Sequence, residues 1–547
     1  MSGGPSYNFA DMFELVVDRV PERTALVVVD PDGGADTRRT FAELEDRANR
    51  LAHHLAGAGV AAGDHVGIYA YNSAEWVESM LALYKIRAVP VNINFRYVED
   101  ELRYLFDNAD LVALVLQREF APRVAKVRDS LPQLKHLVVA DDGSAADLGG
   151  LDDAADYDEA IAGGSPERDF AARSGDDIHM IYTGGSTGMP KGVMWRQEDI
   201  FYALCGGIDA YSNTRVASPT ELVERIDPAN APPVMFPVAP LMHGAGQVST
   251  IRGVIHGDTI VLTPRFDAEQ VWRTVEREKV NILGITGDAM ARPLADVLER
   301  LHDELDLSSM ISVGSSAAIF SPSIKEQIMA LLPNALVVDS VGATETGMNG
   351  IKIAQPGEKS HGGPATVQAS ADTIVVDDDM KPAAPGVIGR LARTGNVPLG
   401  YYKDPERTAQ TFIEFEGKRY ALAGDLARIE DDGQITLLGR GSVMINSGGE
   451  KVFPEEVEGV LKAHPDVFDA LVVGVPDERW GERVTAVVQP RPGREVALED
   501  LDAHCRGRIA GYKVPRQLFI VDKVSRAPSG KPDYPWAKEL ARSRADA

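Results

Sequence analysis

A segment rich in glycine, hydroxyl groups and lysine has the composition of a phosphate-binding loop. It reads HMIYTGGSTGMPKGV over residues 179–193, and a strand-like apolar run ends at Tyr182, just before the glycines. Glycine lets backbone N–H groups approach an anion closely, hydroxyls add hydrogen-bond donors, and lysine adds positive charge. The spacing fits neither a Walker A loop nor the dinucleotide-binding G-x-G-x-x-G pattern. The phosphate-binding candidates are Thr183, Gly184, Gly185, Ser186, Thr187, Gly188 and Lys191.

The elements that must position this loop alternate between strand and helix. Short β-rich apolar runs recur from HVGIYA at residues 65–70 to ALVVDSVG at residues 335–342, with helical patterns between them, such as the one over residues 40–58. Buried runs separated by helices are typical of parallel strands joined by crossover helices, so we expect an α/β fold. Short strands from about residue 365 to 440 predict a β-rich subdomain, and residues 441–547 predict a small α+β domain.

Composition excludes several classes of protein. The chain has 547 residues, with 56 Lys and Arg against 82 Asp and Glu, which gives a formal net charge of −26. That charge argues against a general nucleic-acid-binding protein and against a polybasic membrane anchor. Two cysteines are too few for a disulfide scaffold or a cysteine-rich metal site. The sequence shows no signal peptide and no run of about 18 uncharged apolar residues, so we expect a cytoplasmic protein without integral membrane association.

Six further segments connect the loop to a known superfamily. They are PVAPLMHGAG (237–246), DSVGATETG (339–347), GYYKDPERTAQTF (400–412), ALAGDLARI (421–429), GRGSVMINSGGEKVFPEEVE (439–458) and APSGKPDY (527–534). Together with YTGGSTGMPKG they resemble, in the same order, the signature motifs of the adenylate-forming superfamily of acyl-CoA synthetases, luciferases and non-ribosomal adenylation domains. The resemblance implies an N-terminal domain over residues 1–440, with two parallel α/β subdomains and the β-rich subdomain. It also implies a mobile C-terminal domain over residues 441–547 that turns about a hinge near Ser442.

The resemblance further implies a reaction in two steps. A carboxylate attacks the α-phosphate of ATP to give acyl-AMP and pyrophosphate, and the thiol of CoA then replaces AMP to give acyl-CoA. Such a site works mainly by positioning the reactants and stabilising charge at phosphorus. The expected cofactor is Mg²⁺, a hard cation that prefers oxygen ligands. The expected partners are ATP, CoA and a small-molecule hydrophobic carboxylate.

The motifs also assign roles to individual residues. Lys531 is expected at the reacting carboxylate and α-phosphate, and Lys191 and Glu345 complete the catalytic set. Glu345 and Thr183 are the candidate Mg²⁺ ligands. Besides the loop, the candidates for binding ATP and AMP are Ser315, Ser316, Asp339, Thr344, Asp425, Arg440 and Lys531. The candidates for CoA are Ser447, Gly448 and Gly449, and those for the acyl substrate are His243, Gly284, Gly287 and Gly342.

Three positions depart from the pattern of the superfamily. Val341 replaces the usual tyrosine of the Y-G-x-T-E motif, and Ser442 takes the place of an aspartate or lysine at the hinge. GSSAA at residues 314–318 replaces the commoner G-G-A-P beside the adenine. The contacts to adenine are therefore the least defined part of the expected site.

The segments near residues 94–116 and 284–294 resemble bacterial acyl-CoA ligases that activate steroid side-chain carboxylates in cholesterol catabolism, which predicts such a substrate. A general medium- or long-chain fatty-acyl-CoA ligase and a fatty-acyl-AMP ligase remain alternatives. A catalytically inactive nucleotide-binding regulator is disfavoured, because the four residues it would need to lose are present: Lys191, Glu345, Asp425 and Lys531. The sequence leaves open whether the chain forms a homodimer.

Overall fold

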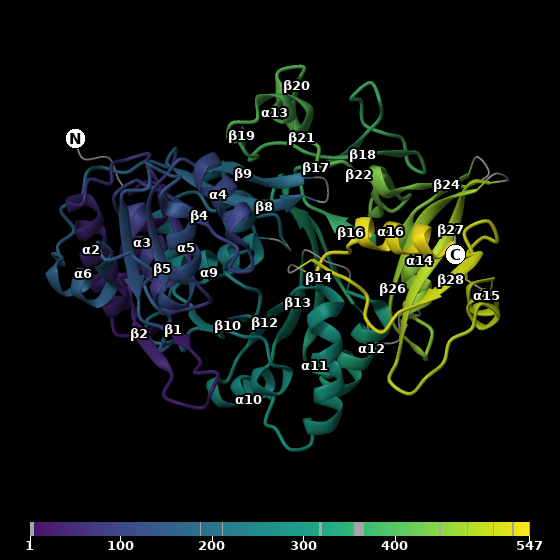
Figure 1. Cartoon of the computed structure of the whole chain (residues 1–547), viewed down its shortest axis with the longest axis horizontal. Coiled ribbons are helices and arrows are strands. Elements are labelled where there is room, and N and C mark those ends of the chain that lie inside the picture. Colours follow the sequence, from purple (N-terminus) through teal and green to yellow (C-terminus); the bar gives the residue numbers. More distant parts are fainter. Residues whose placement is uncertain are drawn as a thin grey trace. The chain divides into compact units, whose positions relative to one another are not determined.

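The structure is a computed structural model. It describes residues 5–185, 188–209, 212–316, 320–354, 366–447, 450–477, 480–506, 508–527 and 530–545. The chain divides into two compact units, and Figure 1 colours it along its sequence. The first unit comprises Met1–Gly284, Leu305–Met310 and Asn396–Phe412, and the second comprises Ile285–Glu304, Ile311–Gly395 and Ile413–Ala547.

The first unit holds an eight-stranded sheet in the order β19-β9-β8-β4-β3-β5-β6-β7. Its strands are β3 (His65–Tyr69), β4 (Val89–Asn92), β5 (Leu111–Gln117), β6 (His136–Ala140), β7 (Ala155–Asp156), β8 (Ile178–Gly185), β9 (Gly188–Arg196) and β19 (Gly400–Tyr401). From β8 through β4, β3, β5 and β6 to β7 the pairs are parallel, which confirms the expected α/β pattern. The strands at the other edge, β9 and β19, are antiparallel to their neighbours.

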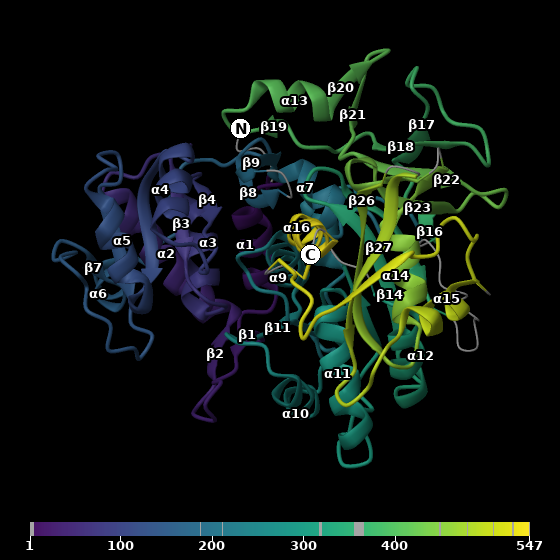
Figure 2. The ribbon, with the colours of Figure 1, turned by 45° about the vertical axis from the view of Figure 1, so that its right-hand side comes forward.

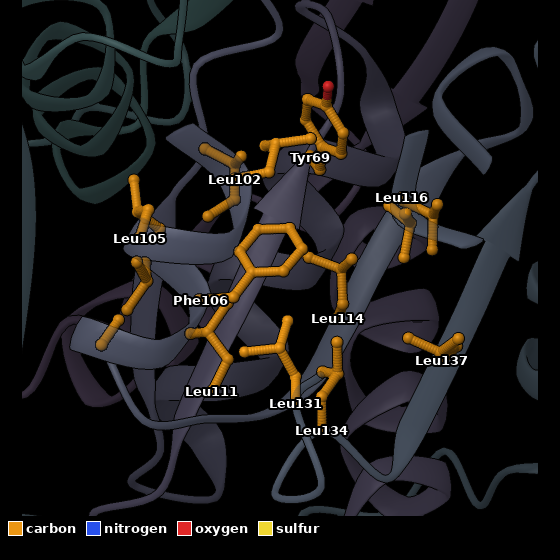
Figure 3. Close-up of a cluster of buried hydrophobic side chains, with 14 of the residues drawn as sticks. Tyr69, Leu102, Leu105, Phe106, Leu111, Leu114, Leu116, Leu131, Leu134 and Leu137 are labelled. Carbon is orange, nitrogen blue, oxygen red and sulfur yellow. The ribbon is translucent and has the colours of Figure 1, made fainter. Parts of the chain in front are cut away.

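A continuous hydrophobic cluster packs two helices against one face of this sheet. Figure 3 shows Phe106 of α4 (Glu99–Asn108) lying among leucines that include Leu111 and Leu114 of β5. Because successive strand residues point to opposite faces, Leu114 and Leu116 share the face that meets the helices. α5 (Ala121–Arg128) adds Val124 to the same cluster. Side chains of β8 belong to the same cluster, so the strand that leads into the expected phosphate loop is anchored in the core of this unit.

A second set of strands in the first unit runs in the order β2-β1-β11-β10-β12 and is parallel except for β2. These strands are β1 (Thr24–Val28), β2 (Thr37–Thr40), β10 (Val234–Pro237), β11 (Thr259–Leu262) and β12 (Ile282–Ile285). The remaining helices of this unit are α1 (Phe9–Arg19), α2 (Phe41–Gly57), α3 (Ala74–Lys85), α6 (Tyr157–Gly163), α7 (Gln197–Leu204), α8 (Pro219–Glu224), α9 (Gly244–His256), α10 (Ala268–Glu278) and α13 (Pro405–Thr411).

The second unit begins with α11 (Gly287–Leu301), α12 (Pro322–Leu331) and the parallel pair β13 (Ser312–Ser315) and β14 (Leu336–Ala343). Antiparallel strands follow over the segment expected to be β-rich. They are β15 (Gly347–Ile353), β16 (Thr366–Ala369), β17 (Thr373–Val376), β18 (Ile388–Arg393), β20 (Phe412–Phe415), β21 (Lys418–Ala421), β22 (Asp425–Ile429) and β23 (Ile435–Arg440).

The C-terminal part of the second unit is a five-stranded sheet between helices. Its elements are β24 (Ile445–Ser447), β25 (Glu450–Val452), α14 (Pro454–Lys462), β26 (Val467–Asp477), β27 (Gly481–Pro490), α15 (Leu498–Arg506), β28 (Gln517–Ile520) and α16 (Tyr534–Ala545). Leu471 and Val473 of β26 pack towards α16, and Ala470 and Val472 pack towards α14 and α15. Figure 2 shows α16 and α14 on opposite sides of β26 and β27. Among the described helices, none is both long and apolar enough to cross a membrane.

Candidate active site

The phosphate loop connects β8 to β9, so its two ends are the arms of an antiparallel hairpin. Thr183 lies opposite Lys191 in this pairing. The Lys191 Nζ atom is 2.8 Å from the Asp404 Oδ2 atom and lies over the Tyr401 ring, 5.6 Å from its centroid. Ser186 and Thr187 lie outside the described residues. The hairpin therefore brings the first hydroxyl candidate and the lysine candidate to the same end of the sheet.

Lys191 has an acidic partner from a second predicted motif. Its hydrogen bond is the main reason why the pKa of Asp404 lies below the ordinary value. Asp404 also accepts a hydrogen bond from the Arg407 backbone N–H and so caps α13. Both members of the pair are about one-third exposed, so an incoming phosphate has access to the ammonium group.

Asn92, at the end of β4, fixes the base of the loop and was missed by sequence reasoning. Its Nδ2 donates to the carbonyl oxygens of Tyr182 and Met242, at 2.9 and 2.7 Å, and its Oδ1 accepts from the Tyr182 N–H at 2.8 Å. The side chain is buried, so these bonds have little competition from water. The only sequence signal was a polar residue in the apolar run AVPVNIN.

The motif over residues 237–246, which contains the acyl-substrate candidate His243, is held by close backbone approaches. His243 is the N-cap residue of α9, and a Cβ atom at Gly246 would come within 2.7 Å of the Ala239 carbonyl oxygen, so only glycine fits there. Gly284 pairs with Pro237 across β12 and β10. A Cβ at Gly284 would meet nothing nearer than 3.5 Å, so packing alone does not demand glycine at this position.

In the second unit, the structure pairs two predicted nucleotide-binding residues. Asp425 begins β22 and lies opposite Arg440, the last residue of β23. The Gly441 N–H donates to the Gly424 carbonyl oxygen at 3.2 Å and closes this end of the ladder. The expected ribose-binding carboxylate is thus on the strand beside the one that leads into the expected hinge.

Two other nucleotide candidates pair with each other, since Ser315 ends β13 and lies opposite Asp339 within β14. Ser315 is buried, and its Oγ accepts from the Gly287 N–H at 2.9 Å, while Gly287 itself has a φ of 54°. These contacts give both residues a structural role at the start of α11. Asp339 lies 2.6 Å from the Lys325 ammonium, but burial dominates and its pKa is raised.

The remaining second-unit candidates have local structural settings. Ser316 donates its backbone N–H to the Ile285 carbonyl oxygen at 3.2 Å. A Cβ atom at Gly342 would clash with the Gly347 carbonyl oxygen, so close strand approach demands this glycine. Thr344 and Glu345 occupy the turn between β14 and β15 and are partly buried. Ser447 lies opposite Gly481 in the C-terminal sheet; Gly448 and Gly449 fall outside the described residues.

Buried charges that sequence reasoning missed join α11 to the C-terminal sheet. The Lys462 Nζ of α14 is 3.2 Å from the Asp288 Oδ2 of α11, and both side chains are almost fully buried. Burial acts to raise the pKa of Asp288, but Lys462 and two hydrogen bonds from Ser321 outweigh it and the pKa is lowered. Arg292 of α11 also lies over the Phe468 ring, 5.1 Å from its centroid.

Backbone hydrogen bonds link Lys531 and Gly530 to Ala527 near the C-terminus. The Lys531 carbonyl oxygen accepts from the Ala527 N–H at 2.9 Å, and the Gly530 N–H donates to the Ala527 carbonyl oxygen at 2.8 Å. Gly530 has a φ of 78°, which favours glycine. Within the described residues, no group of three or more His, Cys, Asp or Glu side chains could hold a metal ion.

Comparisons with known proteins agree with the motifs. Residues 13–402 match the family model of the AMP-binding enzymes, and residues 456–531 match that of the AMP-binding enzyme C-terminal domain. A Mycobacterium tuberculosis protein named medium/long-chain-fatty-acid--CoA/3-oxocholest-4-en-26-oate--CoA ligase is 52% identical, covering 98% of this chain and 96% of its own. A Rhodococcus rhodochrous protein named 3-oxocholest-4-en-26-oate--CoA ligase is 51% identical, with 97% and 95% covered. The crystal structure of the anthranilate CoA ligase AuaEII with anthranoyl-AMP superposes with a TM-score of 0.83 at 25% identity and covers 99% of both chains.

Proposed function

The chain belongs to the AMP-binding enzyme family and is an AMP-forming acyl-CoA synthetase, and from this premise we propose that its preferred substrate is a steroid side-chain carboxylate. In the first step a carboxylate oxygen bonds to the α-phosphorus of ATP and pyrophosphate leaves. In the second step the sulfur of CoA bonds to the acyl carbon, AMP leaves, and the thiol proton passes to solvent. Hydroxide is a poor leaving group, and adenylation replaces it with a better one.

One observation carries the substrate proposal. Two relatives, each about half identical to this chain over nearly its full length, share the 3-oxocholest-4-en-26-oate CoA ligase name.

We expect this enzyme to favour a rigid ring system over a flexible chain. A fused-ring acid loses little rotational freedom on binding, so its buried apolar surface converts to affinity more efficiently than that of a fatty acid. In a competition assay with both acids in one tube, kcat/KM for a steroid side-chain acid should exceed that for palmitate by about tenfold or more, which corresponds to about 1.4 kcal/mol.

The first relative's name also includes medium- and long-chain fatty acids, which favours the general fatty-acyl-CoA ligase as the second candidate. A higher kcat/KM for palmitate or a shorter fatty acid would replace the steroid proposal with that one. Measuring AMP release with and without CoA separates both from a fatty-acyl-AMP ligase, because only the CoA ligases need CoA for turnover.

We infer the residue roles from the motifs and their settings. Lys191 binds the β- and γ-phosphates, Asp425 binds the ribose hydroxyls, and Lys531 neutralises charge between carboxylate and α-phosphate. Glu345 stands partly exposed in a turn beside Thr344, and its carboxylate suits Mg²⁺, which when bound screens charge on the phosphates. ATP and CoA are cytoplasmic metabolites, which supports the expected location of the enzyme.

A further inference from the structure

Arg526, five residues before Lys531, links the lysine-bearing segment to β26. Its Nε and Nη2 atoms each lie 2.7 Å from one oxygen of the Asp469 carboxylate, which makes a two-pronged ion pair. Its Nη1 donates to the Gly530 carbonyl oxygen at 3.1 Å. Both side chains are only 12% exposed, so the pair is largely protected from water. One guanidinium group therefore contacts the sheet and the lysine segment at once.

The bond to Gly530 acts on the peptide unit next to the lysine. The Gly530 carbonyl belongs to the planar peptide group that ends at the Lys531 Cα atom, so fixing this oxygen fixes the plane from which the lysine side chain projects. A backbone bridge between Arg526 and Pro532 closes the segment. A hydrogen bond of 2.9 Å from the Ser525 hydroxyl to Asp533 anchors its far end.

Asp469 is itself held rigidly. Its Oδ1 accepts from the Ala470 N–H at 2.8 Å, at the start of a buried strand. A forked ion pair to a fixed carboxylate restricts the guanidinium more than a single hydrogen bond does, because both the distance and the plane are defined. The long lysine side chain has many rotamers, so the position of its ammonium group depends on how well the lysine backbone is fixed.

We propose that Arg526, held by Asp469, is a positioning residue that aims Lys531 at the reacting carboxylate and α-phosphate. This inference rests on the proposed role of Lys531 in the first step. Arg526 touches no reactant in this role, and its whole effect on the rate passes through Lys531.

The first test separates the two half-reactions. Arg526→Ala and Asp469→Asn should each slow ATP-dependent acyl-AMP formation by about 100-fold, the cost of misplacing a reacting group by about 1 Å. Thioester formation from supplied acyl-AMP should stay near the wild-type rate. Arg526→Lys keeps the positive charge but cannot make the two-pronged ion pair. Its rate of acyl-AMP formation should therefore lie between those of the wild type and Arg526→Ala. If Arg526→Ala fails to fold, the same comparison is made with Asp469→Asn and Arg526→Lys.

A matched control comes from the same domain. Arg506 makes a similar forked pair with Asp502 on the exposed surface of α15. Arg506→Ala should leave both half-reactions unchanged. Equal losses in both half-reactions for Arg526→Ala, together with a lower unfolding temperature, would show a merely structural role and overturn the proposal.

The second test is a double-mutant cycle. Because Arg526 acts through Lys531, Arg526→Ala should cost nothing further in a Lys531→Ala background. An additive loss would overturn the positioning role. A slow Lys531→Ala enzyme with a wild-type rate for Arg526→Ala would overturn the positioning role alone. A wild-type rate for Lys531→Ala would overturn the assigned role of Lys531 and the positioning role with it.

Discussion

At the scale of single residues, the candidate site depends on side chains that fix other groups as much as on those expected to touch ATP. Asn92 joins the Tyr182 backbone to that of Met242, so the entry to the phosphate loop and the expected acyl segment share one buried anchor. Asp404 holds Lys191 in place by an ion pair. In the proposed role of Lys191, a phosphate group would compete with the Asp404 carboxylate for the ammonium group. The stabilisation that Lys191 gives to bound ATP would then be the difference between these two interactions.

The residue with the clearest expected effect is Lys531. Lys531→Ala should slow acyl-AMP formation by at least about 100-fold, or about 3 kcal/mol, because one charge-stabilising donor is lost where negative charge concentrates. Thioester formation from supplied acyl-AMP should be affected much less. Pyrophosphate release in single-turnover reactions, and acyl-CoA formation from synthetic acyl-AMP, measure the two steps. Lys523→Ala, at an exposed position of the same domain, is the control, and equal losses in both steps would show that Lys531 has another role.

At the scale of elements, α14 buries charged groups where its sequence reads as an ordinary amphipathic helix. Val457, Val460 and Leu461 face the core at helical spacing, but Glu458 and Lys462 are also buried. The Glu458 Oε1 atom accepts from the Val472 N–H at 2.9 Å, and burial raises the pKa of this carboxyl to about 7. The helix therefore contains a group that titrates near neutral pH.

This pKa predicts a pH-dependent stability. Since the pKa of Glu458 rises from 4.5 to about 7 on folding, the folded state binds the proton more tightly. The group's stabilising contribution is complete below pH 4.5 and is lost as the pH rises towards 7. Glu458→Gln should therefore gain unfolding free energy relative to the wild type between pH 5 and pH 8, by up to about 3 kcal/mol.

Urea unfolding of both proteins at several pH values measures that difference, and other titrating groups cancel in the comparison. Glu499→Gln, at an exposed site on α15, should show no such trend. A difference between Glu458→Gln and the wild type that stayed constant with pH would contradict the assignment.

At the scale of the whole molecule, the expected catalytic cycle needs the C-terminal sheet to serve two steps. Lys531 has its proposed role in the first step, and Ser447, a candidate for CoA binding, lies at the end of β24 in the same domain, opposite Gly481. We propose that residues 441–547 adopt one arrangement for each half-reaction, turning about Ser442. The buried Asp288–Lys462 pair joins α11 to α14 in the arrangement described here, and such a pair is costly to separate.

Restricting the hinge should therefore affect the two steps unequally. Ser442→Pro fixes φ near −65° and removes a backbone donor, so whichever step needs the other hinge conformation should slow by about tenfold or more. Ser442→Ala keeps the backbone free and should behave like the wild type. Unfolding temperatures of both variants, measured beside that of the wild type, will show whether a slower step results from loss of folding instead. Wild-type rates for Ser442→Pro in both half-reactions would rule out a hinge at this position.

The fold class and the two-step chemistry could both be predicted from local features of the sequence. The expected phosphate loop, the proposed ribose-binding carboxylate and the terminal lysine lie in short contiguous motifs. Alternating strand and helix patterns are local too, so motifs and patterns can both be recognised without knowing which segments meet. The helix over residues 40–58 is an example. It begins with a capping box, in which Thr40 and Glu43 each accept a hydrogen bond from the backbone N–H of the other.

Only the tertiary structure decided which side chains are partners. Asp469 and Arg526 are 57 residues apart, and Asn92 and Tyr182 are 90 residues apart. Neither the spacing nor the composition of these segments indicates that the two residues of each pair are in contact. The antiparallel return of β9 after the loop, and the burial of Glu458 and Lys462 on a helix that reads as ordinary, have the same origin. These features follow from how strands and helices pack. Burial and strand pairing depend on residues that are distant in the chain, whereas a motif is recognised from a few consecutive residues.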